Sequence, residues 1–336
     1  MPEIAVTVVI PTLAADAALQ ECVLSLTKQT RRDFEVIVVD NSGKSLVGKS
    51  GVARHGVRIL EQERNVGFGS AINAGFRHSS APFLATLNDD AAADPHWLEA
   101  LLAAMETRPD VGMCASQVRL AEERTLDSAG MLIARDCSSK QRGHLAPPSC
   151  FERQEDVLFP SGSAALYRRA MLERIGLFDD DYFLYCEDTD LGLRARWAGW
   201  KCLYVPSAVV FHRLSHSAGR ASPLKAYYVE RNRLFTLVKN MPLQRLPASC
   251  LATLARYWWH AFLMMRRRGT AARFREGHGS WRLAFYVLKA HAALLLCLPR
   301  LLRKRRQVRR LARLSTEEFG RLLDAHAIPV REVAEL

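Results

Sequence analysis

Apolar and polar residues alternate along the first 120 residues in blocks that are typical of strands and helices in turn. Short apolar runs rich in β-branched residues predict strands at 4–10, 34–39, 57–60 and 83–87. Apolar residues at helical spacing predict helices at 17–29, 65–78 and 95–106. Because strands and helices alternate, we expect a mostly parallel sheet with helices on both faces.

Polar residues follow three of the predicted strands. Thr12 comes after the first strand, Asp40 after the second, and an Asn-Asp-Asp triplet at 88–90 after the strand at 83–87. Ligands of open α/β sheets bind at the carboxyl ends of the strands, where these side chains would meet. Adjacent carboxylates there need a positive partner, such as a divalent metal that holds a nucleotide's diphosphate. The alternatives are a polar turn at 88–90 and a turn cap at Asp40, whose carboxylate can otherwise bind a nucleobase or ribose.

A glycine-rich segment at 64–75 opens the second predicted helix. Gly67 and Gly69 let the backbone approach a ligand closely, and a helix N-terminus favours an anion. The segment lacks the GxGxxG spacing of dinucleotide folds and the spacing of P-loops. By itself it is a weak indication of a binding site.

An acidic trio, Glu187, Asp188 and Asp190, follows an aromatic run and opens a helix predicted at 190–198. Acidic residues at such a position can simply cap the helix and complement its dipole. A carboxylate beside apolar rings is also a better base, because burial disfavours its charged form. Both interpretations hold together if Glu187 and Asp190 cap the helix while Asp188 faces a cleft.

His212 ends an apolar strand expected at 208–212, about two dozen residues after the acidic trio. A histidine in such a place can be a hydrogen-bonded core residue. Imidazole, carboxylate and diphosphate oxygens together also form a reasonable octahedral set for Mn²⁺, and a less ideal one for Mg²⁺.

Taken in order, these blocks resemble a known family. The matching stretches are VTVVIPTL, FEVIVVDNSG, RNVGFGSAINAGF, ATLNDDA, LDSAG, FPSGSAALYRRAMLERIGLFDDDYFLYCEDTDLGLRARWAGW and VVFHRLSHSAG. They cover about residues 5–220 and resemble inverting glycosyltransferases of family 2, in particular the bacterial rhamnosyltransferase-like branch. The resemblance implies a GT-A fold, which is an α/β Rossmann-like mixed sheet, here with a basic helical C-terminal extension.

The resemblance also implies roles for individual residues. Asp188 takes the place of the catalytic base, and Asp90 and His212 that of the ligands of Mn²⁺ or Mg²⁺. Donor-binding residues would be Pro11, Thr12, Asp40, Asn65, Gly67, Asn88 and Asp89. Gly162, Glu187 and Asp190 would serve the acceptor or a secondary role. Asn88 replaces the first acid of the family's DxD motif and brings no charge to the metal.

The implied reaction is a metal-dependent inverting sugar transfer in cell-surface polysaccharide synthesis. The metal neutralises the diphosphate leaving group, while Asp188 takes the proton of an acceptor hydroxyl that attacks the opposite face of the anomeric carbon. Rhamnose from dTDP-rhamnose is the expected donor and a polyprenyl-linked glycan the expected acceptor. A galactofuranosyl or other UDP-sugar transferase is the alternative.

Two other classes of function compete with sugar transfer. A nucleotidyltransferase would want a glycine-rich basic loop after the first strand, and residues 11–18 contain neither glycine nor a basic residue. A non-catalytic nucleic-acid binder is suggested by the pI of about 9.6. It leaves the acidic crevice unexplained and no nucleic-acid motif occurs, so no nucleic-acid partner is expected.

The net charge of +12 is unevenly distributed. Residues 222–336 contain 23 Lys and Arg against 7 Asp and Glu, a net +16, whereas residues 1–221 carry a net −4. We therefore predict two domains, a GT-A domain at 1–221 and a basic helical region at 222–336. The oligomeric state cannot be inferred.

The basic region contains an amphipathic helix at 222–240 and apolar helices at 251–265 and 281–302, the last closed by Pro299. Tryptophans and arginine flanks suit helices that lie on an anionic membrane surface. Lys289, near the middle of 281–302, argues against a membrane-spanning helix. Ordinary helical packing and a span remain the alternatives.

Cysteine usage and the N-terminus bear on the compartment. The eight cysteines form no close CxxC pair, and no signal peptide is recognisable. We expect reduced thiols in a cytoplasmic protein of bacterial type, peripheral on the inner face of the cell membrane.

Overall fold

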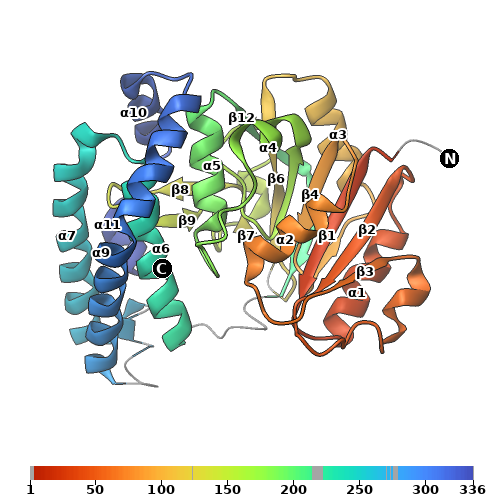
Figure 1. Cartoon of the computed structure of the whole chain (residues 1–336), viewed down its shortest axis with the longest axis horizontal. Coiled ribbons are helices and arrows are strands. Elements are labelled where there is room, and N and C mark those ends of the chain that lie inside the picture. The colour runs from red at the N-terminus through yellow and green to blue at the C-terminus, as the bar shows by residue number, and fades with distance from the viewer. Residues whose placement is uncertain are drawn as a thin grey trace. The chain divides into compact units, whose positions relative to one another are not determined.

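A computed structural model describes residues 4–122, 124–213, 222–269, 271–272, 274 and 279–335. The described residues form two compact units (Figure 1). The first draws on Met1–Met131, Gln141–Phe183 and Trp200–His216, and the second on Leu132–Lys140, Leu184–Gly199 and Ser217–Leu336. Two internal segments therefore group with the C-terminal helices. The predicted boundary between 221 and 222 stays a prediction, because residues 214–221 lie outside the described part of the chain.

A mixed sheet is the core of the first unit. Its strands are β1 (Val6–Thr12), β2 (Phe34–Asp40), β3 (Arg58–Glu61), β4 (Phe83–Leu87), β5 (Ala91–Ala93), β6 (Val111–Leu120), β7 (Leu126–Ser128), β10 (Glu155–Asp156), β11 (Ala164–Arg168) and β12 (Lys201–His212). Their hydrogen-bonded order is β10-β12-β6-β11-β4-β1-β2-β3, with β5 beside β12 and β7 beside β6. The predicted mixed α/β fold is confirmed.

The N-terminal half of the sheet is parallel, as the alternation of strands and helices predicted. β1 pairs in parallel with both β2 and β4, and β2 pairs in parallel with β3. Parallel order ends at β11, which is antiparallel to both β4 and β6. The carboxyl ends of β1, β2 and β4 therefore meet at one edge, and Thr12 lies directly opposite Asp40.

The first strand extends beyond its predicted end at Ile10. The Thr12 carbonyl accepts a hydrogen bond from the Asn41 amide on the β2 side. Because the backbone groups of successive strand residues face opposite sides, the backbone nitrogen of the preceding Pro11 faces the β4 side of β1. Pairing with β4 has already ended there at Val9. The missing amide proton of Pro11 consequently interrupts no ladder, and the strand continues to Thr12.

Helices cover both faces of this sheet, as expected. They are α1 (Ala17–Thr27), α2 (Phe68–Arg77), α3 (Trp97–Glu106) and α4 (Arg169–Ile175), with 3₁₀ turns at Gly51–His55 and Pro148–Cys150. Asp16 caps α1 by accepting from the amides of Ala18 and Leu19. Apolar residues of α1 and α3 share one core cluster with β1, and Gly75 lets α2 approach the other face, since a Cβ there would lie 2.4 Å from Val9.

The second unit is mainly helical and confirms the predicted C-terminal helical extension. It contains α5 (Glu187–Trp197), α6 (Pro223–Asn240), α7 (Leu246–Met265), α9 (Ser280–Leu311), α10 (Thr316–Ala325) and α11 (Val330–Glu335), with a 3₁₀ turn at Leu243–Arg245. A short hairpin of β8 (Met131–Ile133) and β9 (Ser139–Gln141) joins them. α6 packs along α9, and α7 packs against α11 (Figure 1).

The prediction that Pro299 closes the long basic helix is wrong. α9 continues through Pro299 to Leu311, although an interior proline costs about 3 kcal/mol in a helix. Beyond the proline, Leu301 and Val308 are buried and Arg305 donates to the Val238 carbonyl of α6 at 2.7 Å. This packing offsets the lost backbone hydrogen bond. Among the described residues, Trp281–Leu311 is the one helix long and apolar enough to cross a membrane.

Candidate functional site

Asp89 lies at the carboxyl end of β4, beside the end of β1. The Thr12 hydroxyl is 2.6 Å from Asp89 Oδ2 and 2.6 Å from the Ala14 carbonyl. A hydroxyl has one proton, so both contacts are hydrogen bonds only when Asp89 is itself protonated. Burial raises the pKa of Asp89 to about 6, helped by the neighbouring Asp90 and opposed by Thr12. The structure thus brings two predicted donor-binding residues into direct contact.

His212, the last residue of β12, lies between two carboxylates. Its Nε2 is 3.1 Å from Asp90 Oδ1, and its Nδ1 is 3.0 Å from Asp127 Oδ2. Asn88 Nδ2 is 3.3 Å from the same Nε2. Asp90 and His212 are therefore neighbours, as a shared role requires.

The charges in this cluster support one another. Burial lowers the pKa of His212, but its hydrogen bonds to Asp127 and Asp90 outweigh burial and raise the pKa to about 10. Burial raises the pKa of Asp127, but His144 and His212 lower it to about 2. The imidazole is consequently a cation held between two anions.

Asp127 is a site residue that sequence reasoning missed. It belongs to the three-residue strand β7, whose pairing with β6 brings it beside His212. The LDSAG stretch was the available signal, because an acid followed by small residues is unusual in a buried strand. Only the fold shows which side chain that acid contacts.

The cluster fits a divalent cation in its donor chemistry. Asn88 Oδ1 is buried and has no hydrogen-bond partner among the described residues, and Asp90 Oδ1 contacts only the His212 imidazole there. Oxygen donors beside one imidazole suit Mn²⁺ or Mg²⁺. No group of three or more His, Cys, Asp or Glu side chains in the described ranges is arranged as a metal cage. A cation here would need further ligands from a bound diphosphate and water.

Asp40 is tied to the loop that follows β2. Its Oδ1 accepts from the Ser42 amide and hydroxyl, and its Oδ2 accepts from the Val47 amide at 2.7 Å. Burial acts to raise the pKa of Asp40, but these hydrogen bonds outweigh it and hold the pKa below the usual range. The carboxylate shapes the loop, as the turn-cap alternative describes, and a ligand would reach it only by sharing these bonds.

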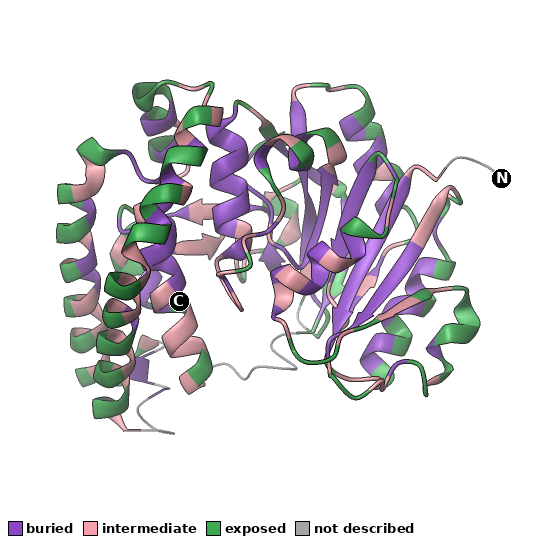
Figure 2. Cartoon of the chain, viewed as in Figure 1, coloured by how far each residue is buried: buried purple, intermediate pink, exposed green. Residues whose placement is uncertain are grey.

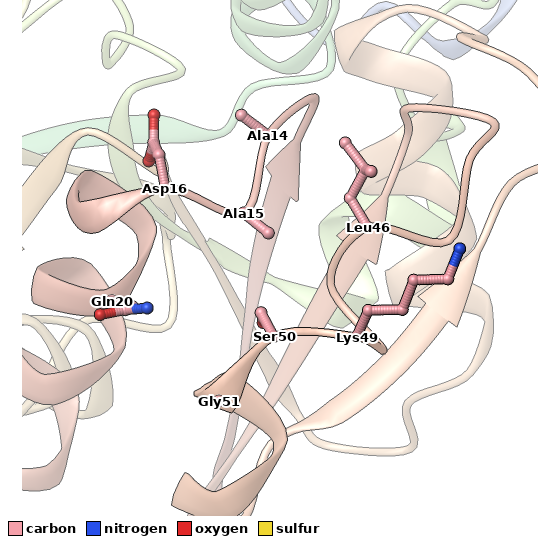
Figure 3. A pocket seen from close by; sticks show the side chains of 8 residues that line it. All are labelled: Ala14, Ala15, Asp16, Gln20, Leu46, Lys49, Ser50 and Gly51. Atoms are coloured by element: carbon pink, nitrogen blue, oxygen red, sulfur yellow. The ribbon is translucent and has the colours of Figure 1, made fainter.

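An open cavity of about 480 Å³ lies beside this loop (Figure 3). Its lining residues are Ala14, Ala15, Asp16, Gln20, Leu46, Lys49, Ser50 and Gly51. They come from the segment after β1 and the first turn of α1, and from the loop after β2 and the start of the 3₁₀ turn at Gly51–His55, so the cavity lies at the edge where the strands end. Lys49 contributes a cation that the sequence did not single out.

The glycine-rich segment is held by two asparagines. Asn65 Oδ1 accepts from the Gly67 amide at 2.9 Å and from Asn41 Nδ2 at 3.1 Å. Gly67 has φ +88°, and a Cβ there would lie 2.1 Å from the Phe183 carbonyl oxygen. The glycine thus permits a close approach of two chain segments. Asn41 is buried and links the end of β2 to the segment before α2 through these hydrogen bonds. The sequence analysis did not identify it as a site residue.

Gly162 lies in the turn that leads into β11. The neighbouring Ser163 carbonyl accepts from the Asn88 amide at 2.8 Å. The turn therefore fixes the backbone of the Asn-Asp-Asp triplet, and Gly162 is next to the cluster described above.

The three acidic residues of the EDTD motif belong to the second unit, in the first turn of α5. That helix begins three residues earlier than predicted, at Glu187. Tyr185 and Cys186, which precede it, have left-handed φ values of 69° and 63°. Asn232 of α6 stabilises this turn by donating to the carbonyls of Leu184 at 2.8 Å and Tyr185 at 2.7 Å.

Glu187 and Asp188 have different surroundings. Glu187 is buried, and burial together with the charge of Asp188 raises its pKa to about 8. Asp188 is half-buried, and its Oδ1 accepts from the Thr189 amide at 2.6 Å. Thr189 in turn shares a 2.8 Å hydrogen bond with Ser139 of β9. With a pKa of about 8, Glu187 is mostly neutral at physiological pH, whereas Asp188 is held by a backbone amide.

Asp190 anchors α5 to α6. Its carboxylate is fully buried and contacts Arg194 at 2.9 Å, Lys239 at 2.7 Å and Asn240 at 2.9 Å. These partners are the structural reason for an acid at this position. Its carboxylate is directed to cations within the helical unit.

A parallel Rossmann-like half-sheet with carboxylates and an amide beyond its strand ends is the architecture of nucleotide-sugar transferases of the GT-A class. The sequence model described as "Glycosyl transferase family 2" matches residues 7–176. The chain belongs to glycosyl transferase family 2 and is a sugar-transferring enzyme.

Within this family, the chain is similar to a rhamnosyltransferase. The chain is 30% identical over 291 residues to the N-acetylglucosaminyl-diphospho-decaprenol L-rhamnosyltransferase of Mycobacterium tuberculosis, which covers 79% of this chain and 90% of that protein. The resemblance to the rhamnosyltransferase branch is thereby confirmed.

Solved structures confirm the fold. GalNAc-T7, crystallised with UDP, GalNAc and Mn²⁺, aligns with a TM-score of 0.58 at 16% identity, over 82% of this chain and 55% of that chain. The mannosyltransferase PcManGT of Pyrobaculum calidifontis, in complex with GDP-Man and Mn²⁺, aligns with a TM-score of 0.50 at 17% identity, over 96% and 86%.

Proposed function

We propose that this enzyme transfers rhamnose with inversion from dTDP-rhamnose to a sugar on a polyprenyl diphosphate. The relative from M. tuberculosis, whose name specifies such an acceptor, supports the sugar and the lipid. The observation that carries the proposal is the Asp90–His212–Asp127 cluster at the end of β4, with the buried, unpartnered Oδ1 of Asn88 beside it in the described part of the chain. A UDP-sugar, such as UDP-galactofuranose, is the alternative donor.

The donor half of the reaction is assigned to the strand edge of the first unit. Asp90 and His212 would hold Mn²⁺ or Mg²⁺ after the imidazole gives up the Nε2 proton that it shares with Asp90, and Asn88 Oδ1 would bind beside them. A metal bound there supplies Lewis-acid stabilisation of the departing nucleoside diphosphate. Thr12 and Asp89 would hold the ribose side of the donor, with Pro11, Asp40, Asn65 and Gly67 forming the surrounding loops.

The acceptor half is assigned to α5. Asp188 would accept the proton of the attacking hydroxyl, and a single displacement at the anomeric carbon inverts its configuration. Glu187, buried and neutral, would donate a hydrogen bond to the acceptor without adding a second charge beside Asp188. Gly162 and Asp190 would act indirectly, through the turn and the ion pairs that they hold.

We also propose that the helical unit docks on the inner face of the cell membrane. Large apolar residues are exposed along one face of α9, namely Trp281, Phe285, Leu288, Leu295, Leu296 and Leu302 (Figure 2). Trp281, Phe285, Leu288, Leu295 and Leu302 are spaced by four, three, seven and seven residues, which places them in one stripe, and Leu296 adjoins it. Exposed arginines flank it at 282, 300, 303, 306 and 310. An apolar stripe with cationic flanks matches an anionic bilayer in both hydrophobicity and charge.

Nucleotide release tests the proposed reaction directly. The full chain is incubated with dTDP-rhamnose, UDP-galactofuranose or UDP-N-acetylglucosamine, a lipid-linked N-acetylglucosaminyl diphosphate, and Mn²⁺ or EDTA. We expect transfer from dTDP-rhamnose with Mn²⁺, loss of transfer with EDTA, and a large loss in Asp90→Ala. If only a UDP-sugar is transferred, the assignment of dTDP-rhamnose as the donor is wrong. If Asp90→Ala keeps full activity in EDTA, the assignment of a metal site is wrong.

A further inference from the structure

We infer that Lys140 and Lys225 form the binding site for the diphosphate of the lipid-linked acceptor. The inference rests on the proposed function and specifies where its acceptor binds. Both lysines belong to the helical unit, and neither stands out in the sequence.

Lys140 is on strand β9, one residue after a direct contact with α5. The preceding Ser139 shares a 2.8 Å hydrogen bond with Thr189, which follows Asp188 in the chain. Strand β9 therefore runs past the first turn of α5. Lys225, in the first turn of α6, approaches the same turn from another element, because its ammonium is 5.7 Å from the ring centre of Tyr185.

Lys140 is a half-buried cation without an anionic partner among the described residues. Burial, together with the positive charges of Lys225 and Arg256, lowers the pKa of Lys140 to about 8. His260 nearby is affected in the same way, since burial, Arg256 and Lys140 lower its pKa to about 4. A half-buried cation that lies near other cations and has no paired anion of its own costs stability unless an anion binds.

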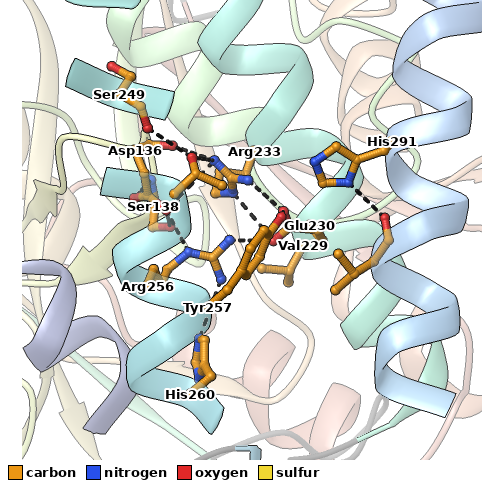
Figure 4. A network of polar contacts seen from close by, with 12 residues as sticks. Asp136, Ser138, Val229, Glu230, Arg233, Ser249, Arg256, Tyr257, His260 and His291 are labelled. Carbon is orange, nitrogen blue, oxygen red and sulfur yellow. Dashed lines mark hydrogen bonds and ion pairs between the residues drawn. The ribbon is translucent and has the colours of Figure 1, made fainter. Parts of the chain in front are cut away.

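The carboxylates closest to this region are already paired (Figure 4). Asp136, at the tip of the β8–β9 hairpin, contacts Arg256 at 2.5 Å and accepts from Arg233 through its carbonyl. Glu230 binds Arg233, Arg256 at 2.6 Å and the Tyr257 hydroxyl. Two anions are thereby shared by two arginines. The charge of Lys140 is left over, so the network attracts an external anion.

The diphosphate of the proposed acceptor is an anion that can pair with the positive charge of Lys140. This diphosphate is bonded to the same sugar ring that carries the attacking hydroxyl, so the anion must lie within one sugar residue of the base. Lys140 follows Ser139, which contacts Thr189, and Lys225 is 5.7 Å from the Tyr185 ring centre, so both lysines are near the turn that carries Asp188. Lysine ammonium groups bind phosphate oxygens as point charges and tolerate a flexible ligand.

The test compares two acceptors with the same sugar. One is N-acetylglucosaminyl diphosphate on an undecyl chain, and the other is the neutral octyl N-acetylglucosaminide. We expect Lys140→Met and Lys225→Met each to raise the KM for the diphosphate acceptor about tenfold or more. The KM for the neutral acceptor and for the nucleotide sugar should stay within twofold of wild type, and Lys140→Arg should retain most of the affinity.

A stability measurement separates binding from a structural role. Because Lys140→Met removes an unpaired cation from among other cations, it should raise Tm by about 2 °C while weakening acceptor binding. Wild-type protein should gain Tm from inorganic pyrophosphate, and Lys140→Met should lose that gain. Lys28→Met, an exposed lysine at the end of α1, is the matched control and should change neither quantity.

The outcomes distinguish this inference from the proposed function. Equal loss on the neutral acceptor, or a higher KM for the nucleotide sugar, would overturn the assignment to the acceptor diphosphate. Loss of binding to phosphatidylglycerol vesicles in Lys140→Met, with unchanged KM in detergent, would assign the lysine to lipid headgroups instead. If wild type transfers no sugar to either acceptor, the proposed function fails, whereas normal transfer with unaffected lysine variants refutes only this inference.

Discussion

At the scale of single residues, adjacent carboxylates differ because their surroundings differ. Glu187 is buried without a cation and is neutral, while Asp188 is half-buried and held by the Thr189 amide. In the first unit, Asp89 rests against a hydroxyl and Asp90 against an imidazole. Neighbouring acids therefore differ in burial and in partners, and on this difference rest the proposed roles of Glu187 as a neutral donor, Asp188 as a base and Asp90 as a ligand.

Replacing the proposed base should abolish turnover and spare donor binding. We expect Asp188→Asn to lower kcat by about 10²–10⁴-fold, the usual contribution of a general base, with an unchanged KM for the nucleotide sugar. Initial rates of nucleotide release measure both quantities. The exposed Asp156→Asn on β10 is the control, and near-normal turnover of Asp188→Asn would remove the assignment.

The buried Glu187 should make stability depend on pH. Its pKa is about 8 in the folded state and about 4.3 in an unfolded chain, so the folded state holds its proton more tightly. The resulting stability is complete below the unfolded pKa and is lost as pH rises through the folded value. Between pH 5 and 8 the free energy of unfolding should fall by up to about 1.4 kcal/mol per pH unit.

Urea unfolding of Glu187→Gln across that range checks the assignment. The variant cannot titrate at this position, so its stability should vary less with pH than that of wild type. Two parallel curves would show that Glu187 is charged in the folded protein.

At the scale of elements, the strained turn before α5 depends on α6. Left-handed backbone at two residues other than glycine costs about 1–3 kcal/mol each, and Asn232 supplies two hydrogen bonds in return. The same helix anchors α5 at Asp190 through Lys239 and Asn240. The orientation of the EDTD motif is therefore set by a helix that follows it by dozens of residues.

A glycine at position 186 should restore part of the stability and activity that the protein loses when Asn232 is replaced. We expect Asn232→Ala to destabilise the protein by about 1–3 kcal/mol and to lower kcat at least tenfold, because two carbonyls lose their donor and the turn relaxes. Adding Cys186→Gly should restore part of both, since glycine adopts the left-handed conformation without strain. Denaturation and initial rates on the single and double variants decide this; no recovery in the double variant would mean that Asn232 acts through packing alone.

At the scale of the whole molecule, charge and apolar surface are divided between the two compact units. The acidic strand edge that would hold the nucleotide sugar is in one, and the arginine-flanked stripe of α9 is in the other. The proposed lipid-linked acceptor would use both, with the nucleotide sugar bound in the mildly acidic unit and the membrane contacted by the basic region.

Polar substitutions on α9 should reduce membrane binding. Leu295 and Leu296 are 70% and 84% exposed, and burying each in lipid is worth about 1.5–3 kcal/mol. The double variant Leu295→Asn/Leu296→Asn should bind phosphatidylglycerol vesicles at least tenfold more weakly in flotation, with normal transfer to a detergent-soluble acceptor. Leu24→Asn on α1 is the control. Absence of vesicle binding by wild type, with a dimer that the double variant loses, would assign the stripe to a second copy.

The sequence by itself determined the elements and the chemistry types. Alternating apolar blocks fixed the parallel half-sheet, because strand and helix periodicities are local, and acids after apolar runs marked Asp40, Asp89, Asp90 and Asp188. The end of α9 was misplaced at Pro299, since burial of Leu301 and Val308 is a tertiary effect that local rules omit.

Only the tertiary structure decided which polar groups meet. Asp127 joins His212 across 85 residues, and Asn232 holds a turn 47 residues away. Asp136 and Glu230 bind arginines of α6 and α7, and among the described residues no anion pairs with Lys140. Pairing of charges depends on distance and burial in three dimensions. A sequence specifies which charges exist, and the fold determines which of them remain available for a ligand.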